Sequence, residues 1–192
     1  MHRSIWIDEV VLEFDPALLR AWTNGDKSLA PPFMAAADNR RNQPSYHFGE
    51  AFVLRHFHER EGWLGFTDYA IGPQYPGSLR RQAGREELAR RVPAPALTAL
   101  RALRSGKAEY RLGSGEPDVF LYHPDGRLMF LEVKKGKDRV DARQTKCLGQ
   151  IAATIGCPVG IVYLKELGRR RTPRRYELPL PEEKELARAR AM

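Results

Sequence analysis

Residues 115–122 read GEPDVFLY and residues 128–135 read LMFLEVKK, and the segment HPDG at 123–126 separates these two runs. Both runs have strand composition, and Pro, Asp and Gly between them are typical of a tight turn, so the stretch predicts a β-hairpin. Successive strand side chains point to opposite faces, which puts Glu132 and Lys134 on one face. In a hairpin of this register Asp118 lies across from Glu132. The sequence therefore predicts two carboxylates and one ammonium at one end of a sheet.

These side chains are suited to the hydrolysis of a phosphodiester. Two adjacent carboxylates are unfavourable without a cation, and Mg²⁺ prefers oxygen ligands such as Asp118, Glu132 and the main-chain carbonyl of Val133. A cation held there can neutralise a phosphate and activate a water molecule, with Mn²⁺ as a substitute for Mg²⁺. Lys134 can orient that water or stabilise charge on the phosphate oxygens. Alternatively, Glu132 and Lys134 form a solvated pair on an edge strand, but the apolar run before them favours a central strand.

The flanking sequence predicts an α/β fold. Apolar residues at helical or strand spacing, ended by Gly and Pro, give the remaining elements. The order from residue 46 is α-β-β-β-α-β, which indicates a mixed central sheet flanked by helices. The predicted elements are a helix over 46–60, a strand over 63–71, a helical pair over 78–105 broken near Pro93 and Pro95, the hairpin, a helix over 141–155 and a strand over 159–164.

The motif residues also resemble a known family. Pro117-Asp118 followed by Glu132-Val133-Lys134 is similar to the PD-(D/E)XK nuclease superfamily. The continuation, Lys135-Gly136-Lys137-Asp138-Arg139 with Gln144 five residues later, resembles its VRR-NUC branch. The resemblance implies a restriction-endonuclease-like core and a Mg²⁺-dependent DNA endonuclease that leaves 5′-phosphate and 3′-hydroxyl ends.

The resemblance also implies further site residues. The family adds an acid from its first core helix, for which Glu50 is the expected fourth metal-site residue beside Asp118, Glu132 and Val133. Gln144 is expected to support catalysis by contacting Lys134, the water or the phosphate. The catalytic set is therefore Glu50, Asp118, Glu132, Lys134 and Gln144. The implied organisation is an N-terminal extension and loop over 1–45, a nuclease core over 46–164 with a helical insert over 73–107, and a basic tail over 165–192.

Composition is consistent with a nucleic-acid partner. The 192 residues carry a formal charge of +8 and several arginine clusters, which favour a polyanion such as structured or branched DNA. The N-terminus does not resemble a signal peptide, and Cys147 and Cys157 fit no disulfide framework or zinc motif, so we expect a cytoplasmic protein. A homodimer is one expected state.

Several alternatives remain at this level. The biological context can be DNA repair, recombination or phage biology, or a restriction, anti-phage or toxin system with the same site. The chain can also be a non-catalytic nucleic-acid-binding module. Asp138 and Arg139 can cap the loop or contact phosphate, and residues 169–175 can bind phosphate or form a solvated linker. His47 can contact the site, whereas His56 and His58 cannot both face one ligand.

Overall fold

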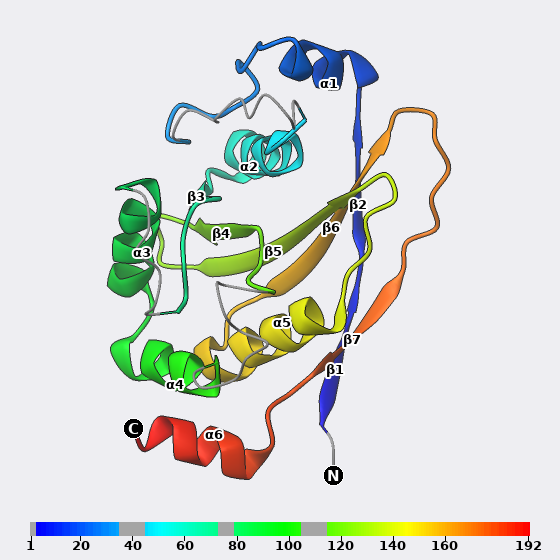
Figure 1. Cartoon of the computed structure of the whole chain (residues 1–192). Helices are drawn as coiled ribbons and strands as arrows, with labels where there is room; N and C mark the ends of the chain where they lie inside the picture. The colour runs from blue at the N-terminus through cyan, green and yellow to red at the C-terminus, as the bar shows by residue number, and fades with distance from the viewer. Residues whose placement is uncertain (1–2, 35–44, 73–78, 105–114) are drawn as a thin grey trace.

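The computed structural model of the chain describes residues 3–34, 45–72, 79–104 and 115–192 (Figure 1). The elements run in the order β1 (Ser4–Asp8), β2 (Val10–Phe14), α1 (Pro16–Thr23), α2 (Phe48–Glu61), β3 (Leu64–Phe66), α3 (Leu79–Arg91), α4 (Ala94–Arg104), β4 (Val119–Tyr122), β5 (Leu128–Lys135), α5 (Ala142–Ile155), β6 (Val159–Glu166), β7 (Arg175–Pro179) and α6 (Glu183–Arg190).

A five-stranded mixed sheet forms the centre of the molecule. Its strands lie in the order β2-β6-β5-β4-β3. The strands β3, β4 and β5 are antiparallel, whereas β6 pairs parallel with both β5 and β2. The predicted α-β-β-β-α-β core is thus confirmed as α2-β3-β4-β5-α5-β6, with α3 and α4 inserted after β3.

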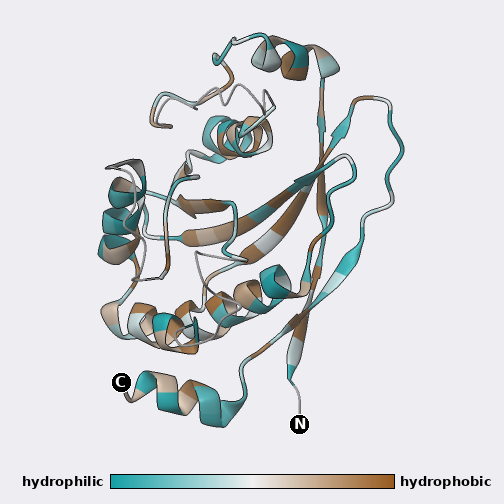
Figure 2. Cartoon of the chain, in the orientation of Figure 1, coloured by the Kyte–Doolittle hydropathy of each residue, from teal (hydrophilic) through white to brown (hydrophobic). Residues whose placement is uncertain are grey.

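Both faces of the sheet are covered by helices, and Figure 1 shows α2 on one side and α5 with α4 on the other. The face of Val119, Leu131 and Val133 packs against the buried side of α2. The opposite face, with Phe120 and Phe130, packs against α3, α4 and α5. Strands buried on both faces read as continuous apolar runs, which is why β4 and β5 are brown for most of their length in Figure 2.

The hairpin forms as its turn residues predict. His123 donates its main-chain N–H to Arg127 O, and Gly126 donates to His123 O, each at 2.9 Å. Gly126 has φ of +94°, a left-handed conformation that glycine adopts without strain. The turn fixes the register in which Val119 pairs with Leu131 and Phe120 with Phe130.

The first core strand is shorter than predicted. The sequence predicts a strand over 63–71, but β3 covers only Leu64–Phe66. The main-chain N–H groups of Ile71 and Gly72 instead donate to the Glu116 carboxylate, each at 3.2 Å. Because this carboxylate satisfies the backbone, the segment leaves the sheet and enters the insert. The insert holds the two helices α3 and α4 with Pro93 between them, as predicted; its residues 73–78 and 105–107 lie outside the described part of the chain.

Both ends of the chain pack on this core. Strand β2 extends the sheet beside β6, β1 pairs antiparallel with β7, and α6 packs on α4. Helix α5 comes so close to the end of β7 that a Cβ atom added at Gly149 would overlap the carbonyl oxygen of Pro179. The division at residues 45 and 164 stays a prediction. None of the described helices has the length and apolar character needed to cross a membrane.

Candidate active site

Asp118 and Glu132 lie side by side where β4 begins and β5 ends. The register that pairs Val119 with Leu131 places them opposite each other on the face toward α5. Asp118 Oδ2 accepts a hydrogen bond of 2.8 Å from the main-chain N–H of Val133, which fixes its carboxylate at the strand end. The predicted convergence of the two carboxylates is therefore present in the structure.

Glu132 is fully buried. Its Oε1 accepts hydrogen bonds from Lys134 Nζ and Gln144 Nε2. Its Oε2 is also buried and has no hydrogen-bond partner within the described residues. Burial raises the pKa of Glu132 well above its usual value, and the nearby negative charge of Asp118 adds to the increase. The site thus holds a carboxylate oxygen that the protein alone leaves unsatisfied.

Burial likewise raises the pKa of Asp118, and the charge of Glu50 acts in the same direction, although hydrogen bonds at the carboxylate oppose the shift. Ionising both carboxylates at once is therefore unfavourable unless a positive charge lies near them. A positive charge placed between them would lower both pKa values.

Lys134 provides one fixed positive charge. Its Nζ lies 2.5 Å from Glu132 Oε1, and its side chain is only 12% exposed. Burial lowers the pKa of Lys134, but the carboxylates of Glu132, Asp118 and Asp138 more than compensate, so the net shift is upward. Lys134 is therefore an ammonium at neutral pH.

Gln144 contacts Glu132, and not Lys134, which was one of its expected partners. It stands in the first turn of α5, where Asp141 is the N-cap, and its Oε1 accepts from the Asp141 N–H in a capping box. Only the amide NH₂ then remains to point at the site. Because an ammonium carries donors only, this NH₂ can pair with the carboxylate of Glu132 and not with Lys134.

Glu50 lies in the first turn of α2, as predicted, where the helix dipole favours a negative charge. Its Oε1 is 3.2 Å from Nδ1 of His47, which is the residue before the helix and has φ of +60°. Burial raises the pKa of Glu50. The hydrogen bond and charge of His47 and the charge of Lys135 together lower it by more, so the net shift is downward. Glu50 is the most readily ionised of the three carboxylates.

A cavity of about 410 Å³ joins these groups. Its walls include Asp118, Glu50, Val133 and Lys134, whereas the fully buried Glu132 lies behind them. Further lining residues are His47, Lys135 and Asp138. Asp138 thus faces the site, while the cap of α5 is Asp141; Arg139 is exposed and does not line the cavity.

Lys135 is the residue that sequence reasoning overlooked. It alternates to the face opposite Lys134, and its Nζ donates to Ser45 O at 3.1 Å. The two consecutive lysines at the end of β5 could have indicated this position, because adjacent strand residues point to opposite faces of the sheet.

The donor set is compatible with a hard divalent cation. Asp118, the unsatisfied Oε2 of Glu132 and the main chain of Val133 offer only oxygen, which is the ligand type that Mg²⁺ prefers. No group of three or more His, Cys, Asp or Glu side chains gathers in metal-binding geometry within the residues described. Two carboxylates and a main-chain carbonyl could hold an ion whose other ligands are water and substrate, and Glu50 as a direct ligand stays a prediction.

Comparison with known proteins identifies the fold family. A model of the VRR-NUC domain matches residues 71–165. No curated protein matches the chain. Two similar solved structures are crystal structures of paFAN1, bound to gapped DNA with a 1-nucleotide and a 2-nucleotide 5′ flap.

The likeness to those structures is distant. The first is 20% identical with a TM-score of 0.39, covering 68% of this chain and 25% of that chain. The second is 23% identical with a TM-score of 0.30, covering 65% and 21%. The chain thus spans about a quarter of the length of those chains. Residues 71–165 contain all of the central motif, Asp118, Glu132, Lys134 and Gln144, and the chain therefore carries a VRR-NUC domain.

Proposed function

We propose that this protein is a divalent-cation-dependent endonuclease that hydrolyses phosphodiester bonds in branched or otherwise structured DNA. The observation that carries the proposal is the cluster in which Asp118 and Lys134 line one cavity and the buried Glu132 is bonded to Lys134 behind them. The VRR-NUC match supports nuclease activity, and the formal charge of +8 favours a polyanionic substrate.

Asp118, Glu132 and the Val133 carbonyl are the residues that would hold the cation, for which Mg²⁺ is the proposed ion and Mn²⁺ a substitute. When bound, such a cation neutralises the phosphate and lowers the pKa of a water molecule. Gln144 keeps Glu132 Oε1 occupied, and the buried Oε2 has no hydrogen-bond partner in the described chain. Its role in this proposal is to position the Glu132 carboxylate.

Lys134 acts as a charge and not as a base. Its raised pKa keeps it protonated, so it can stabilise the negative charge that grows on the phosphate oxygens in the transition state. Among the described residues that line the cavity, the pair of His47 and the ionised Glu50 is suited to accept a proton from the attacking water.

Replacing Lys134 with methionine is expected to lower the cleavage rate by about 100-fold to 1000-fold, because a fixed transition-state charge is lost while side-chain volume is kept. The measurement is a cleavage assay with Mg²⁺ on linear, 5′-flap and four-way DNA, in which wild-type protein leaves 5′-phosphate ends. Lys137→Met is the matched control, because Lys137 is exposed and does not line the cavity. Tight DNA binding without cleavage of any substrate under Mg²⁺ or Mn²⁺ would contradict the proposal and indicate a binding module.

Replacing Asp118 with asparagine is expected to have two effects on stability. It should not destabilise the protein without divalent ions, and it should abolish the stabilisation by Mg²⁺. An unfolded aspartate titrates near pH 4 or just below it. Because burial raises the pKa of Asp118 in the folded protein, folded protein binds more protons between the two pKa values, and stability falls as pH rises through this range. At pH 8 without divalent ions, Asp118→Asn should therefore be at least as stable as wild type, since asparagine can still accept the bond from Val133.

With Mg²⁺ at about one hundred times Kd, wild type should gain about 2.7 kcal/mol, or roughly 5–10 °C in Tm, and Asp118→Asn should gain almost nothing. Thermal unfolding with and without Mg²⁺ measures both effects. Asp8→Asn, which changes an exposed carboxylate on β1, should respond to Mg²⁺ as wild type does. An equal gain in the Asp118→Asn protein would place the cation elsewhere.

A further inference from the structure

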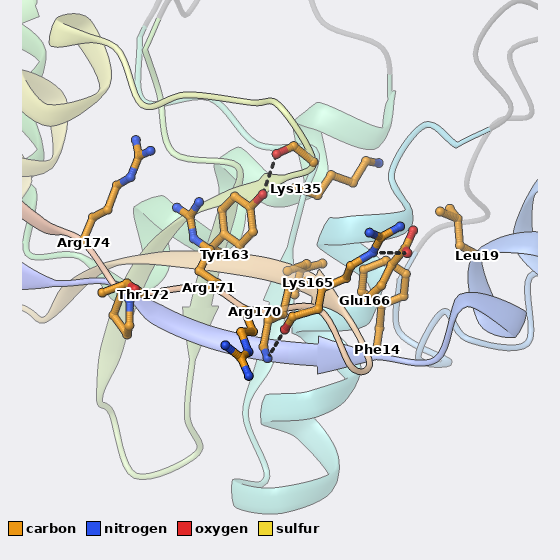
Figure 3. A pocket seen from close by; sticks show the side chains of 14 residues that line it. Phe14, Leu19, Lys135, Tyr163, Lys165, Glu166, Arg170, Arg171, Thr172 and Arg174 are labelled. Carbon is orange, nitrogen blue, oxygen red and sulfur yellow. Dashed lines mark hydrogen bonds and ion pairs between the residues drawn. The ribbon is translucent and has the colours of Figure 1, made fainter.

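A second and larger cavity lies next to the candidate active site. Its volume is about 750 Å³, and its walls come from β2, α1, β6 and the loop 167–174 that leads to β7 (Figure 3). Lys135 lines both cavities, so the two share a wall at the end of the catalytic strand β5. Tyr163 strengthens this junction, because its hydroxyl donates a hydrogen bond of 2.5 Å to the carbonyl of Gly136.

The loop over 167–174 is firmly anchored. Its centre is held by Glu9, whose side chain is fully buried. The Glu9 carboxylate accepts hydrogen bonds from Nε and one Nη of Arg171, at 2.9 and 2.6 Å. The Glu9 N–H also donates to Arg174 O at 2.7 Å, and the Leu167 N–H donates to Phe14 O at 2.8 Å. The loop is therefore a built wall of the cavity and not a solvated linker.

Three cations of this wall are already paired with carboxylates. Arg171 pairs with Glu9, Lys165 with Glu13 at 2.6 Å, and Arg169 with Glu166 at 3.6 Å. Arg171 also lies on the ring of Tyr163, with 3.3 Å between its guanidinium carbon and the ring centroid. These pairs shape the cavity but add little net charge to it.

The two other arginines of the loop have no such partner among the described residues. Within the described chain no carboxylate pairs with Arg170 or Arg174, and both residues are exposed. Figure 3 shows the side chains of Arg170 and Arg174 at separate points of the loop, and Lys135 lines both this cavity and that of the active site. The lining of the cavity also includes the apolar side chains of Phe14, Leu19 and Leu164. Exposed arginines beside apolar side chains fit the backbone and sugars of a nucleic-acid strand.

We infer that this cavity binds a single-stranded arm of the DNA substrate, next to the bond that is cleaved. The inference rests on the proposed nuclease function and extends it to a substrate feature. A volume of 750 Å³ lies in the range of ligand pockets and admits a nucleotide of a single strand, whereas the broad surface of a duplex cannot enter it. Arg171 on Tyr163 offers a flat guanidinium on which a base can stack. Arg170 and Arg174 neutralise phosphates of the arm. Lys135, which lines both cavities, contacts the DNA strand where it enters the active site.

The test measures DNA binding by fluorescence anisotropy without divalent ions, so that no cleavage occurs. One DNA is a duplex carrying a 5′ single-stranded arm of about ten thymidines, a length within the usual site size of such grooves. The other is the same duplex with a nick in place of the arm. The variant is Arg170→Ala/Arg174→Ala, and the control is Lys184→Ala/Arg188→Ala, which removes two exposed charges from α6.

We expect the loop variant to weaken binding of the armed DNA by about tenfold or more and to reduce the slope of log K against log salt by about 1.4, the value for two single-strand phosphates. Binding of the nicked duplex should change by less than about twofold, and the α6 control should bind both DNAs as wild type does. Equal losses on armed and nicked DNA would assign the cavity to duplex, and no loss would remove it from the DNA path; either result overturns the inference. Cleavage by wild type in Mg²⁺ reports separately on the proposed function.

Discussion

Replacing Glu132 with glutamine is expected to lower the single-turnover rate of DNA cleavage by about 1000-fold, which corresponds to about 4 kcal/mol of transition-state stabilisation. Glu132 contributes the only buried carboxylate oxygen in the described chain that has no hydrogen-bond partner. Glutamine keeps the size of the side chain and can still accept from Lys134, but it removes the negative charge that would hold a cation.

The fold should survive this change, because the amide oxygen of glutamine can still accept the hydrogen bond that Lys134 donates to Glu132. Binding of uncleaved DNA without divalent ions should stay within about threefold of wild type, since Glu132 does not line the cavity. Circular dichroism checks the fold, and rapid-quench measurement on a flap DNA gives the rate.

Glu177→Gln is the matched control, because Glu177 is an exposed strand carboxylate on β7, far along the chain from the site. It should cleave at the wild-type rate. If Glu132→Gln kept more than about a tenth of the wild-type rate, the carboxylate would have no central part in catalysis, and the assignment of roles would be wrong.

Replacing Gly149 with alanine is expected to destabilise the protein by about 2 kcal/mol and to lower Tm by roughly 4–8 °C. Alanine is the better helix former by about 1 kcal/mol, so the intrinsic preference acts in the opposite direction. The added methyl group, however, would overlap the carbonyl of Pro179 and lie 3.5 Å from the main chain of Leu178. Backbone cannot move aside as a side chain can, so α5 must shift away from β7.

Gly160→Ala on β6 is the matched control. Its added methyl would meet the Cδ2 atom of Leu131, 2.8 Å away, at the end of a flexible side chain. This change should lower stability by less than about 1 kcal/mol. Urea unfolding of both variants measures the difference, and equal stabilities would show that the approach of α5 to β7 is looser than the structure has it.

Local rules explain why so much of the core could be predicted. The turn at His123–Gly126 and the two-residue period of β5 depend on neighbouring residues alone, and together they fix Glu132, Lys134 and Asp118 on one face. The end of α5 was also readable, because Gly156 takes the left-handed conformation with φ of +74° that ends the helix. The strand predicted over 63–71 failed because the N–H groups of Ile71 and Gly72 had a better acceptor in Glu116, 44 or more residues away.

The sequence by itself determined the hairpin, the helix–strand order and the pairing of carboxylates with a lysine, since each depends on contacts between residues close in the chain or on strand alternation. Only the tertiary structure decided that Gln144 donates a hydrogen bond to Glu132 and that Lys135 lines two cavities. It also decided that Glu9 binds Arg171, 162 residues away in the chain. Such partners are chosen when the sheet assembles, because hydrogen-bond and ion-pair energies depend on burial and distance, which no local pattern specifies.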